Sequence, residues 1–256
     1  MQGGVIMAKY YIDISHHETV RSWNTLKQNY PFLVSKATEG QTYIDSSLNS
    51  FIRNCEAKGI PYWLYAFLKK DDELAQAKFL VNTCKGKVGK HFIGYILDVE
   101  SGNNVAGVKK AMDYIEGLGR KCMIYTMYAD YTRYRSVIVN RGKNTAWWEA
   151  RYGKNDGTYR SKYPCHSGVD LHQYSENGTA AGMKGKNNID VNRLTGKKSE
   201  SWFATKATAK KKSNTEIAKE VIAGKWGNAG ERKKILKAAG YNYAAIQKIV
   251  NKLCKK

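Results

Sequence analysis

Short apolar segments alternate with helix-like segments along the first 195 or so residues, and this alternation limits the possible folds more than any other feature. The apolar segments are five to ten residues long, which is typical of buried strands. Strands that alternate with helices favour a parallel sheet, because each parallel connection needs a crossover that a helix can supply. The expected strands cover residues 10–14, 32–37, 62–67, 91–100, 121–126, 145–150 and 169–174.

The segments between these strands carry apolar residues three or four positions apart, as amphipathic helices do. One helix is expected to be capped by Asp45 and to stop at Gly59, and two more are expected over 71–84 and 105–119. Turn residues multiply after about Gly153, so the last third of the domain should be irregular. The sequence predicts an α/β fold with an irregular β/α (TIM-like) barrel. A doubly wound open sheet is the alternative, although no Gly-rich phosphate turn follows the first strand.

A second, smaller pattern follows a basic stretch without periodicity at residues 196–212, which we interpret as a linker. Ser213 and Glu216 form an S-x-x-E capping box, and three short helical patterns follow it. They predict a small three-helix bundle close to the minimum size for independent folding. The expected domains are therefore a barrel at 8–195, the basic linker at 196–212 and a helical bundle at 213–254.

The charge of the chain is strongly positive, +21 in total, and residues 197–256 contribute +12 of it. A basic surface attracts polyanions such as nucleic acid, teichoic acid or anionic lipid. No RNP, KH or helix-turn-helix signature is present, so we expect no nucleic-acid partner. No run of about 18 apolar residues exists, so we expect no membrane insertion. The first residues lack a cationic segment followed by an apolar one, so no secretory signal is expected.

Several chemistries lack their sequence signatures. The five cysteines include no C-x-x-C pair, and the histidines show no H-E-x-x-H spacing. There is no P-loop and no G-x-S-x-G elbow. We therefore expect no metal and no cofactor.

Two acidic residues end one of the most apolar segments, ILDVE. Asp98 and Glu100 are two positions apart, so on a strand they share a face, with Cα atoms about 6.5–7 Å apart. The carboxyl ends of parallel barrel strands are where active sites are built. Paired carboxyls can protonate a glycosidic oxygen and stabilise the cation that forms. The alternative interpretation is a solvated pair at the end of a strand.

Two further aspartates occupy similar positions. Asp13 ends the first strand, and Asp190 lies in the segment NNIDVN. If the barrel closes, both can meet Asp98 and Glu100 at one end. Their structural alternatives are a helix cap for Asp13 and a turn residue for Asp190.

Aromatic residues are frequent, with 18 tyrosines and 6 tryptophans, and these side chains can pack on sugar rings while hydrogen-bonding hydroxyls. Tyr65, Tyr125, Trp148 and Tyr174 lie near the ends of expected strands. Core packing is the alternative role for each of them.

Taken in order, the stretches YYIDIS, FLVSKATEG, ILDVE, WWEARYG and VDLHQYSENG with IDVN resemble glycoside hydrolase family 25, over residues 9–195. The resemblance implies an irregular β/α barrel and N-acetylmuramidase activity on the β-1,4 bond from N-acetylmuramic acid to N-acetylglucosamine. The chain departs from many relatives at Ala66, where they carry histidine, which would remove a polar contact. The implied catalytic residues are Glu100, Asp98, Asp13 and Asp190, and the expected substrate-binding residues are Lys36, Tyr65, Tyr125, Trp148 and Gln173.

The C-terminal stretches AKEVIAGKWGN and GYNYAAIQKIVN look like one CW-seven cell-wall-binding repeat, which implies binding to the peptidoglycan muropeptide. Together the two resemblances imply a phage endolysin that is made in the host cytoplasm and acts at the wall after release. A bacterial autolysin remains an alternative. So do a non-catalytic wall-binding protein on a lysozyme-like barrel and a basic nucleic-acid-binding protein. Retaining and inverting mechanisms both stay open, because backbone spacing does not fix the separation of the carboxyls.

Overall fold

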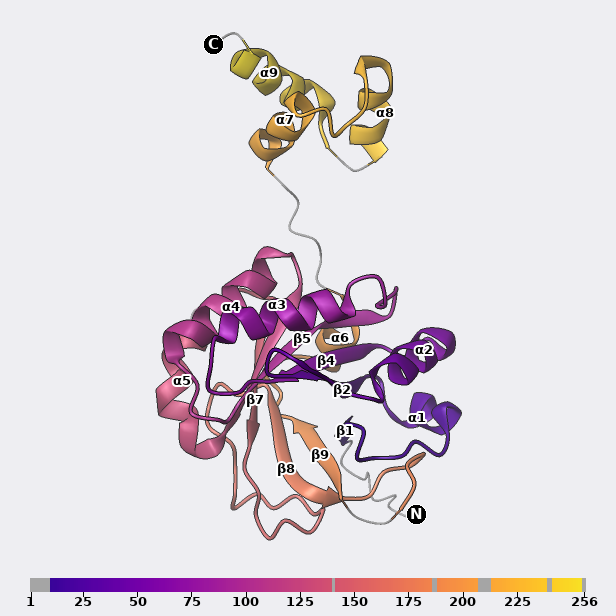
Figure 1. Ribbon diagram of the computed structural model, residues 1–256, viewed down its shortest axis with the longest axis vertical. Coiled ribbons are helices and arrows are strands. Elements are labelled where there is room, and N and C mark those ends of the chain that lie inside the picture. The colour runs from indigo at the N-terminus through magenta and orange to yellow at the C-terminus, as the bar shows by residue number, and fades with distance from the viewer. Residues whose placement is uncertain (1–9, 140, 186–187, 207–212, 239–240, 255–256) are drawn as a thin grey trace, which may run out of the picture. The chain divides into compact units, whose positions relative to one another are not determined.

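The computed structural model describes residues 10–139, 141–185, 188–206, 213–238 and 241–254. The chain divides into two compact units, Met1–Thr208 and Ala209–Lys256, and each is described by itself. Figure 1 labels the elements of both units. None of the described helices is long and apolar enough to cross a membrane.

Eight strands close into a barrel in the first unit. Their order is β1, β9, β8, β7, β6, β5, β4, β2, and β1 pairs with β2 to complete the ring. All pairs are parallel except those of β9 with β1 and with β8. The strands are β1 (Tyr11–Ile14), β2 (Leu33–Glu39), β4 (Tyr62–Phe67), β5 (Phe92–Val99), β6 (Lys121–Met127), β7 (Thr145–Ala150), β8 (Leu171–Gly178) and β9 (Ile189–Leu194). The predicted barrel is confirmed, and the open-sheet alternative is wrong because the sheet has closed on itself.

The seven expected strands are all present, and the sequence pattern missed two. β3 (Tyr43–Ile44) forms a short hairpin with the end of β2. β9 lies in the segment NNIDVN, for which we expected no strand, and it runs beside β8 in Figure 1. A strand with polar residues forms there because it is held between β8 and β1.

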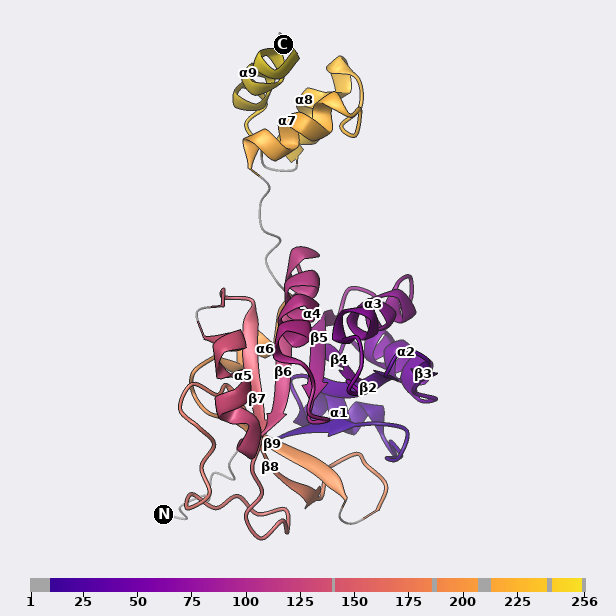
Figure 2. The ribbon, with the colours of Figure 1, turned by 60° about the vertical axis from the view of Figure 1, so that its left-hand side comes forward.

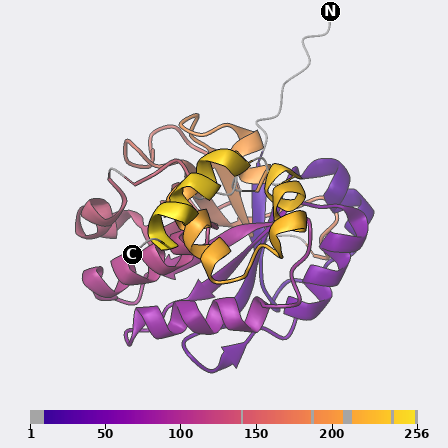
Figure 3. The same ribbon diagram turned by 90° about the horizontal axis from the view of Figure 1, so that it is seen from above.

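Helices pack on the outside of the barrel against β2, β4, β5, β6 and β7, as Figures 2 and 3 show for the first unit. They are α1 (Trp23–Asn29), α2 (Leu48–Lys58), α3 (Glu73–Cys84), α4 (Val105–Gly117) and α5 (Tyr131–Ile138), which the short 3-10 helix η1 (Tyr128–Asp130) precedes. α2 ends at Gly59, whose φ of 69° suits glycine. α2 begins later than expected: Ser47 directly precedes it without a side-chain cap, and the Asp45 carboxylate accepts from the Ser47 amide and so caps the turn that leads into the helix. Residues 151–170 contain no helix or strand, as expected for the irregular third.

The core of the barrel has two layers. The inner layer lies within the ring of strands and includes Trp63, which is fully buried. Gly94 on β5 leaves room for the Trp63 side chain, since a Cβ at that position would lie 2.7 Å from the indole. The outer layer lies between strands and helices, and Ala66 belongs to it.

The segment that we expected to be linker begins with a folded element, α6 (Glu200–Ala204). Phe203 is fully buried in the inner core layer, and its carbonyl oxygen accepts a 2.8 Å hydrogen bond from the Trp63 indole. The Lys121 ammonium donates to the carbonyl oxygens of Trp202 and Thr205. Because Lys121 and Trp63 start or nearly start their strands, α6 closes the amino-terminal end of the barrel. Residues 207–212 of the expected linker, and residues 8–9 of the expected barrel, lie outside the described residues.

The second unit contains α7 (Asn214–Ile222), α8 (Ala229–Ala238) and α9 (Tyr243–Cys254). The predicted capping box is confirmed, with Ser213 accepting from the Glu216 amide and the Glu216 carboxylate accepting from the Ser213 amide. A small apolar core joins the three helices and contains Ile217, Ala218, Val221, Leu236, Ile246 and Val250.

Candidate active site

A pocket of about 290 Å³ opens where the parallel strands have their carboxyl ends, which we call the mouth of the barrel. The four acidic residues singled out from the sequence all line it: Asp13 on β1, Asp98 on β5, Glu100 just after β5, and Asp190 at the start of β9. The full lining is Asp13, Tyr65, Phe67, Asp98, Glu100, Tyr125, Met127, Trp148, Tyr152, Gln173, Glu176 and Asp190. Strand closure therefore brings together carboxyls that lie up to 177 positions apart in the chain.

Asp98 and Glu100 form one of two carboxyl pairs. Asp98 is half-buried, and its Oδ1 atom is buried without a hydrogen-bond partner among the described residues. Burial, followed by the charge of Glu100, raises the pKa of Asp98 well above its ordinary value. Glu100 is more exposed, and partial burial raises its pKa while the nearby Lys36 opposes that shift. This pair therefore favours holding a proton at neutral pH, with Glu100 as the member nearer to solvent.

Asp13 and Asp190 form the second pair. They are direct partners across the antiparallel β1–β9 ladder, and their carboxyls are hydrogen-bonded. Burial raises the pKa of Asp13 to about 6, although hydrogen bonds from Asn192 and Gln173 lower it. Burial and then the charge of Asp13 raise the pKa of Asp190 well above its usual range. The arrangement is that of a protonated Asp190 donating to an Asp13 carboxylate.

Gln173 on β8 connects the pocket aromatics to Asp13. Its Oε1 atom accepts hydrogen bonds from the hydroxyls of Tyr125, at 2.8 Å, and Tyr152, at 2.6 Å. Its Nε2 atom therefore faces Asp13 and donates to both carboxylate oxygens, at 3.3 and 3.2 Å. Because two donors fix the amide oxygen, the side chain has only one orientation that satisfies its hydrogen bonds.

Asn192 on β9 holds Asp13 from the other side. Its Nδ2 atom donates to Asp13 Oδ2 at 2.6 Å, and its Oδ1 atom accepts from the Trp148 indole at 2.7 Å. Asn192 is only 1% exposed, so these bonds are shielded from water. The carboxylate of Asp13 thus meets two amide donors and Asp190.

Four of the five expected substrate-binding residues line the pocket, and the fifth lies beside it. Tyr65, Tyr125, Trp148 and Gln173 line the pocket. Lys36 stands beside it, with its ammonium 2.6 Å from Glu39 and 5.2 Å from the centre of the Phe67 ring.

Two positions that we associated with sugar contact lie elsewhere. Tyr174 does not line the pocket and instead packs near Tyr159 and His172, so its core alternative applies. Ala66 faces the outer core layer, so its difference from histidine removes no group from this pocket.

Sequence reasoning missed five residues that complete the site: Phe67, Met127, Tyr152, Glu176 and Asn192. Tyr152, Glu176 and Asn192 lie within the stretches WWEARYG, VDLHQYSENG and IDVN, so proximity to those motifs was the available signal. Strand alternation could not locate Glu176, because the β8–β9 register shifts between Gln173 and Ser175 and again before Gly178.

The site can perform acid–base chemistry with carboxyl groups alone. It contains two carboxyl pairs whose pKa values are raised, and the two pairs differ in how deeply they lie in the pocket. Within the described part of the chain, no three His, Cys, Asp or Glu side chains are placed to hold a metal ion together.

Comparison with protein families gives two matches. Residues 12–183 match the family described as glycosyl hydrolases family 25, and residues 215–254 match the CW_7 repeat. The family match covers more than half of the chain.

Individual relatives are more distant. The autolytic lysozyme of Clostridium acetobutylicum is 27% identical over 184 residues, which cover 70% of this chain and 54% of that protein. The chain thus spans about half the length of this relative. The lysozyme of Streptococcus phage Cp-7 is 25% identical over 252 residues, covering 95% of this chain and 69% of that protein.

Solved structures support the fold. The catalytic domain of endolysin ply40 from bacteriophage P40 of Listeria monocytogenes is similar with a TM-score of 0.67 at 24% identity, and the match covers 79% of this chain and all of that one. A glycosyl hydrolase 25 of Streptococcus pneumoniae is similar with a TM-score of 0.64 at 23% identity, over 78% of this chain and 92% of that one.

Proposed function

The chain belongs to glycosyl hydrolases family 25, and we propose from this that it is a lysozyme that hydrolyses the glycan strands of bacterial peptidoglycan. The bond cleaved is the β-1,4 bond from N-acetylmuramic acid to N-acetylglucosamine. The observation that carries the proposal is the meeting of Asp13, Asp98, Glu100 and Asp190 in one aromatic pocket at the mouth. Glycoside hydrolysis needs a proton donor and a stabilising carboxylate on the same bond, and this pocket offers both.

We assign the roles of the four carboxyls from how deeply each one lies in the pocket. Glu100 is the general acid, because it is the carboxyl of its pair that is nearer to solvent and can take a new proton from water after each turnover. Asp98 lies deeper, and its unpartnered oxygen can accept a hydrogen bond from the 2-acetamido group of the sugar when the proton of the pair is on Glu100. Asp13 and Asp190 bind the substrate hydroxyls and set the charge of the pocket.

The second unit supplies attachment to the wall. Its match to the CW_7 repeat supports binding to peptidoglycan, and we include the muropeptide as its ligand. The +12 charge of residues 197–256 adds attraction to anionic wall polymers. Attachment raises the local concentration of substrate at the catalytic unit.

The biological role that we propose is host lysis as a phage endolysin. Its support is the similarity along 95% of the chain to the lysozyme of Streptococcus phage Cp-7. The similarity to the autolytic lysozyme of Clostridium acetobutylicum makes a bacterial autolysin the second candidate.

Mass spectrometry of digested, purified cell walls tests the activity directly. We expect soluble muropeptides with N-acetylmuramic acid at the new reducing end. Products with N-acetylglucosamine at that end would overturn the bond assignment. Binding to walls without any new reducing ends would show a non-catalytic wall-binding protein.

A further inference from the structure

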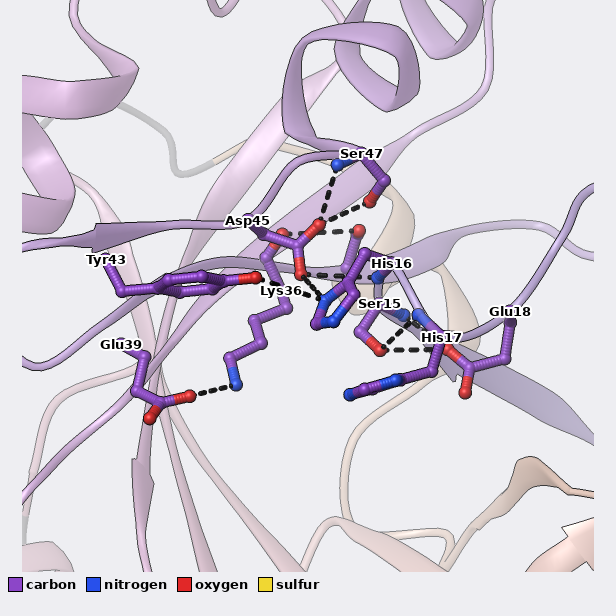
Figure 4. A network of polar contacts seen from close by, with 10 residues as sticks. Ser15, His16, His17, Glu18, Lys36, Glu39, Tyr43, Asp45 and Ser47 are labelled. Carbon is purple, nitrogen blue, oxygen red and sulfur yellow. Dashed lines mark hydrogen bonds and ion pairs between the residues drawn. The ribbon is translucent and has the colours of Figure 1, made fainter.

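Two loop segments at the mouth are joined by one buried carboxylate, Asp45 (Figure 4). The Asp45 side chain has no solvent exposure. Its Oδ1 atom accepts from the amide and hydroxyl of Ser47, at 2.9 and 2.6 Å. Its Oδ2 atom accepts from the amide of His16, at 3.2 Å, and contacts the imidazole Nδ1 at 2.8 Å. The carboxylate therefore ties the loop after β1 to the segment between β3 and α2.

This arrangement fixes the orientation of an exposed imidazole. The His16 side chain is 30% exposed, and a proton on Nδ1 donates to Asp45, which leaves Nε2 as the atom available to a ligand. The His17 ring lies 3.8 Å from the His16 ring, and the Tyr43 hydroxyl lies 3.5 Å from His16 Nδ1. Tyr43 itself is 39% exposed. Asp45 thus orients the His16 ring, and the His17 and Tyr43 rings beside it complete an exposed aromatic surface.

Lys36 lies between this surface and the pocket. The Lys36 ammonium lies 5.9 Å from the centre of the Tyr43 ring and 5.2 Å from that of Phe67, and Phe67 lines the pocket. The pocket volume of about 290 Å³ is at the lower end of the range for one small ligand, about 300–1,000 Å³. A glycan strand must therefore extend from the pocket across the rim of the mouth.

The charges around this surface decide which part of the substrate it suits. Lys36 and Lys69 both pair with Glu39, and the carboxylates of Asp45 and Glu18 lie close by. The three carboxylates outnumber the two ammonium groups, so these charges give no net attraction for the carboxylate of a peptide stem. Exposed ring faces beside hydrogen-bonding atoms suit an uncharged sugar.

We propose that His16 and Tyr43 form a subsite for an N-acetylhexosamine ring of the glycan strand outside the cleavage pocket, and that Asp45 positions His16 for this contact. The inference rests on the proposed hydrolysis of peptidoglycan glycan and adds a rim subsite to it. His16 and Tyr43 contact the sugar, whereas Asp45 acts only through His16.

Kinetics on peptide-free glycan fragments of two lengths test the subsite. For Tyr43→Ala and His16→Gln we expect KM for an octasaccharide to rise about three- to tenfold, as for one aromatic contact, while kcat changes little. KM for a tetrasaccharide should rise much less, because a short fragment can bind without reaching the rim. The control is His91→Gln, which changes a histidine just before β5 at the opposite end of the barrel and should alter neither value.

The positioning role of Asp45 is tested by combining variants. Asp45→Asn should raise KM for the octasaccharide as His16→Gln does, and the double variant should lose no more than either single one. Additive losses would overturn the positioning role. Thermal denaturation of each variant identifies any loss that comes from unfolding, and the surface variants of His16 and Tyr43 keep the test valid if Asp45→Asn unfolds.

Two results would overturn the subsite. Equal KM values for wild type, Tyr43→Ala and His16→Gln at both lengths would show that the rim does not bind glycan. An effect limited to strands that still carry their peptides would identify the peptide as the occupant. Calorimetric titration of the octasaccharide into Glu100→Gln, with and without Tyr43→Ala, measures the contact without turnover. A wild-type protein that cleaves neither fragment would count against the proposed hydrolysis, and this titration would still decide the subsite.

Discussion

Single carboxyls in this pocket differ in their hydrogen-bond partners and in their electrostatic surroundings. Glu100 and Glu176 both line the pocket with exposed side chains, but Glu176 accepts a hydrogen bond from Asn155, whereas partial burial raises the pKa of Glu100. A raised pKa favours the protonated form that a general acid needs, which is why we propose Glu100 as the acid. Both residues are glutamates, so the difference between them must come from their surroundings and not from the side chain itself.

Glu100→Gln should therefore keep the fold and lose activity by about 10²–10⁴-fold, the usual contribution of general acid catalysis. Release of reducing ends from purified walls measures the rate, and thermal denaturation checks the fold. The matched control is Glu176→Gln, which should keep most of the activity. More than about a tenth of the wild-type rate in Glu100→Gln would contradict its role as the acid.

Asn192 should control the pH dependence through Asp13. The pKa of Asp13 is raised to about 6, and the hydrogen bond from Asn192 favours its ionised form. Asn192→Ala removes that bond, so the pKa of Asp13 rises further and the carboxylate appears only at higher pH. A hydrogen bond to a charged group is worth about 1.5–3 kcal/mol, so the acidic limb of the kcat/KM profile should move up by about one to two pH units.

Asn54→Ala is the control for that profile, because Asn54 is half-buried on α2, far in the chain from the pocket residues of β1 and β9, and its side chain bonds to Ser50 within the same helix. An unchanged acidic limb in Asn192→Ala would show that Asp13 does not need to be ionised for activity.

Among the elements, α6 has a structural role that its length does not suggest. Five helical residues carry Phe203 into the inner core layer, and Phe203 stacks on Phe32 with ring centres 5.3 Å apart. Glu200 accepts a 2.7 Å hydrogen bond from the Tyr11 hydroxyl. The first unit is therefore complete only when it includes residues that look like linker in the sequence.

A chain that ends after Lys206 should fold with nearly the thermal stability of the first unit in the full protein. A chain that ends after Gly196 lacks α6 and exposes the inner core, a loss comparable to truncating a buried Phe, about 3–5 kcal/mol. Its Tm should be lower by roughly 10 °C, measured by circular dichroism. Phe203→Ala in the full chain should reproduce much of this loss. Equal Tm values for the two truncated chains would mean that α6 contributes nothing to the barrel.

At the scale of the whole molecule, the chain divides into two compact units, and our proposal assigns cleavage to the first and attachment to the second. The chain ending after Lys206 keeps the catalytic pocket and lacks the CW_7 match. It should cleave soluble glycan fragments at the wild-type rate and lyse intact walls more slowly, because it loses the increase in local concentration. Turbidity of wall suspensions and fragment kinetics measure the two activities. Equal lysis of walls at every salt concentration would rule out attachment by the second unit.

The positive charge of the tail should add a separable, salt-sensitive part of wall binding. Lys206 and the three lysines at 210–212, which lie outside the described residues, can follow anionic polymers by screened attraction with a Debye length near 8 Å at physiological salt. Replacing these four lysines with glutamine should weaken wall binding at low salt and flatten its salt dependence. Sedimentation with purified walls across a salt series measures this. If the intact protein loses all wall binding at moderate salt, the repeat contributes charge alone.

Much of the molecule follows from local sequence pattern. The strands and main helices could be predicted because apolar periodicity depends on neighbouring residues, and the acidic residues at strand ends could be singled out for the same reason. The capping box of α7 is equally local, since its two residues are three positions apart.

Tertiary structure alone decided the features that depend on distant residues. Asn192 and Asp13 are 179 positions apart, and they meet only because β9 closes the barrel against β1. The burial of Phe203 and the contact of His16 with Asp45 likewise depend on which surfaces the closed sheet brings together. Local patterns specify which segments become strands and helices, but the proton-sharing pairs, the amide that holds Asp13 and the helix that seals the barrel arise from long-range packing. Hydrogen bonding and burial act between neighbours in space, and the closed barrel determines those neighbours.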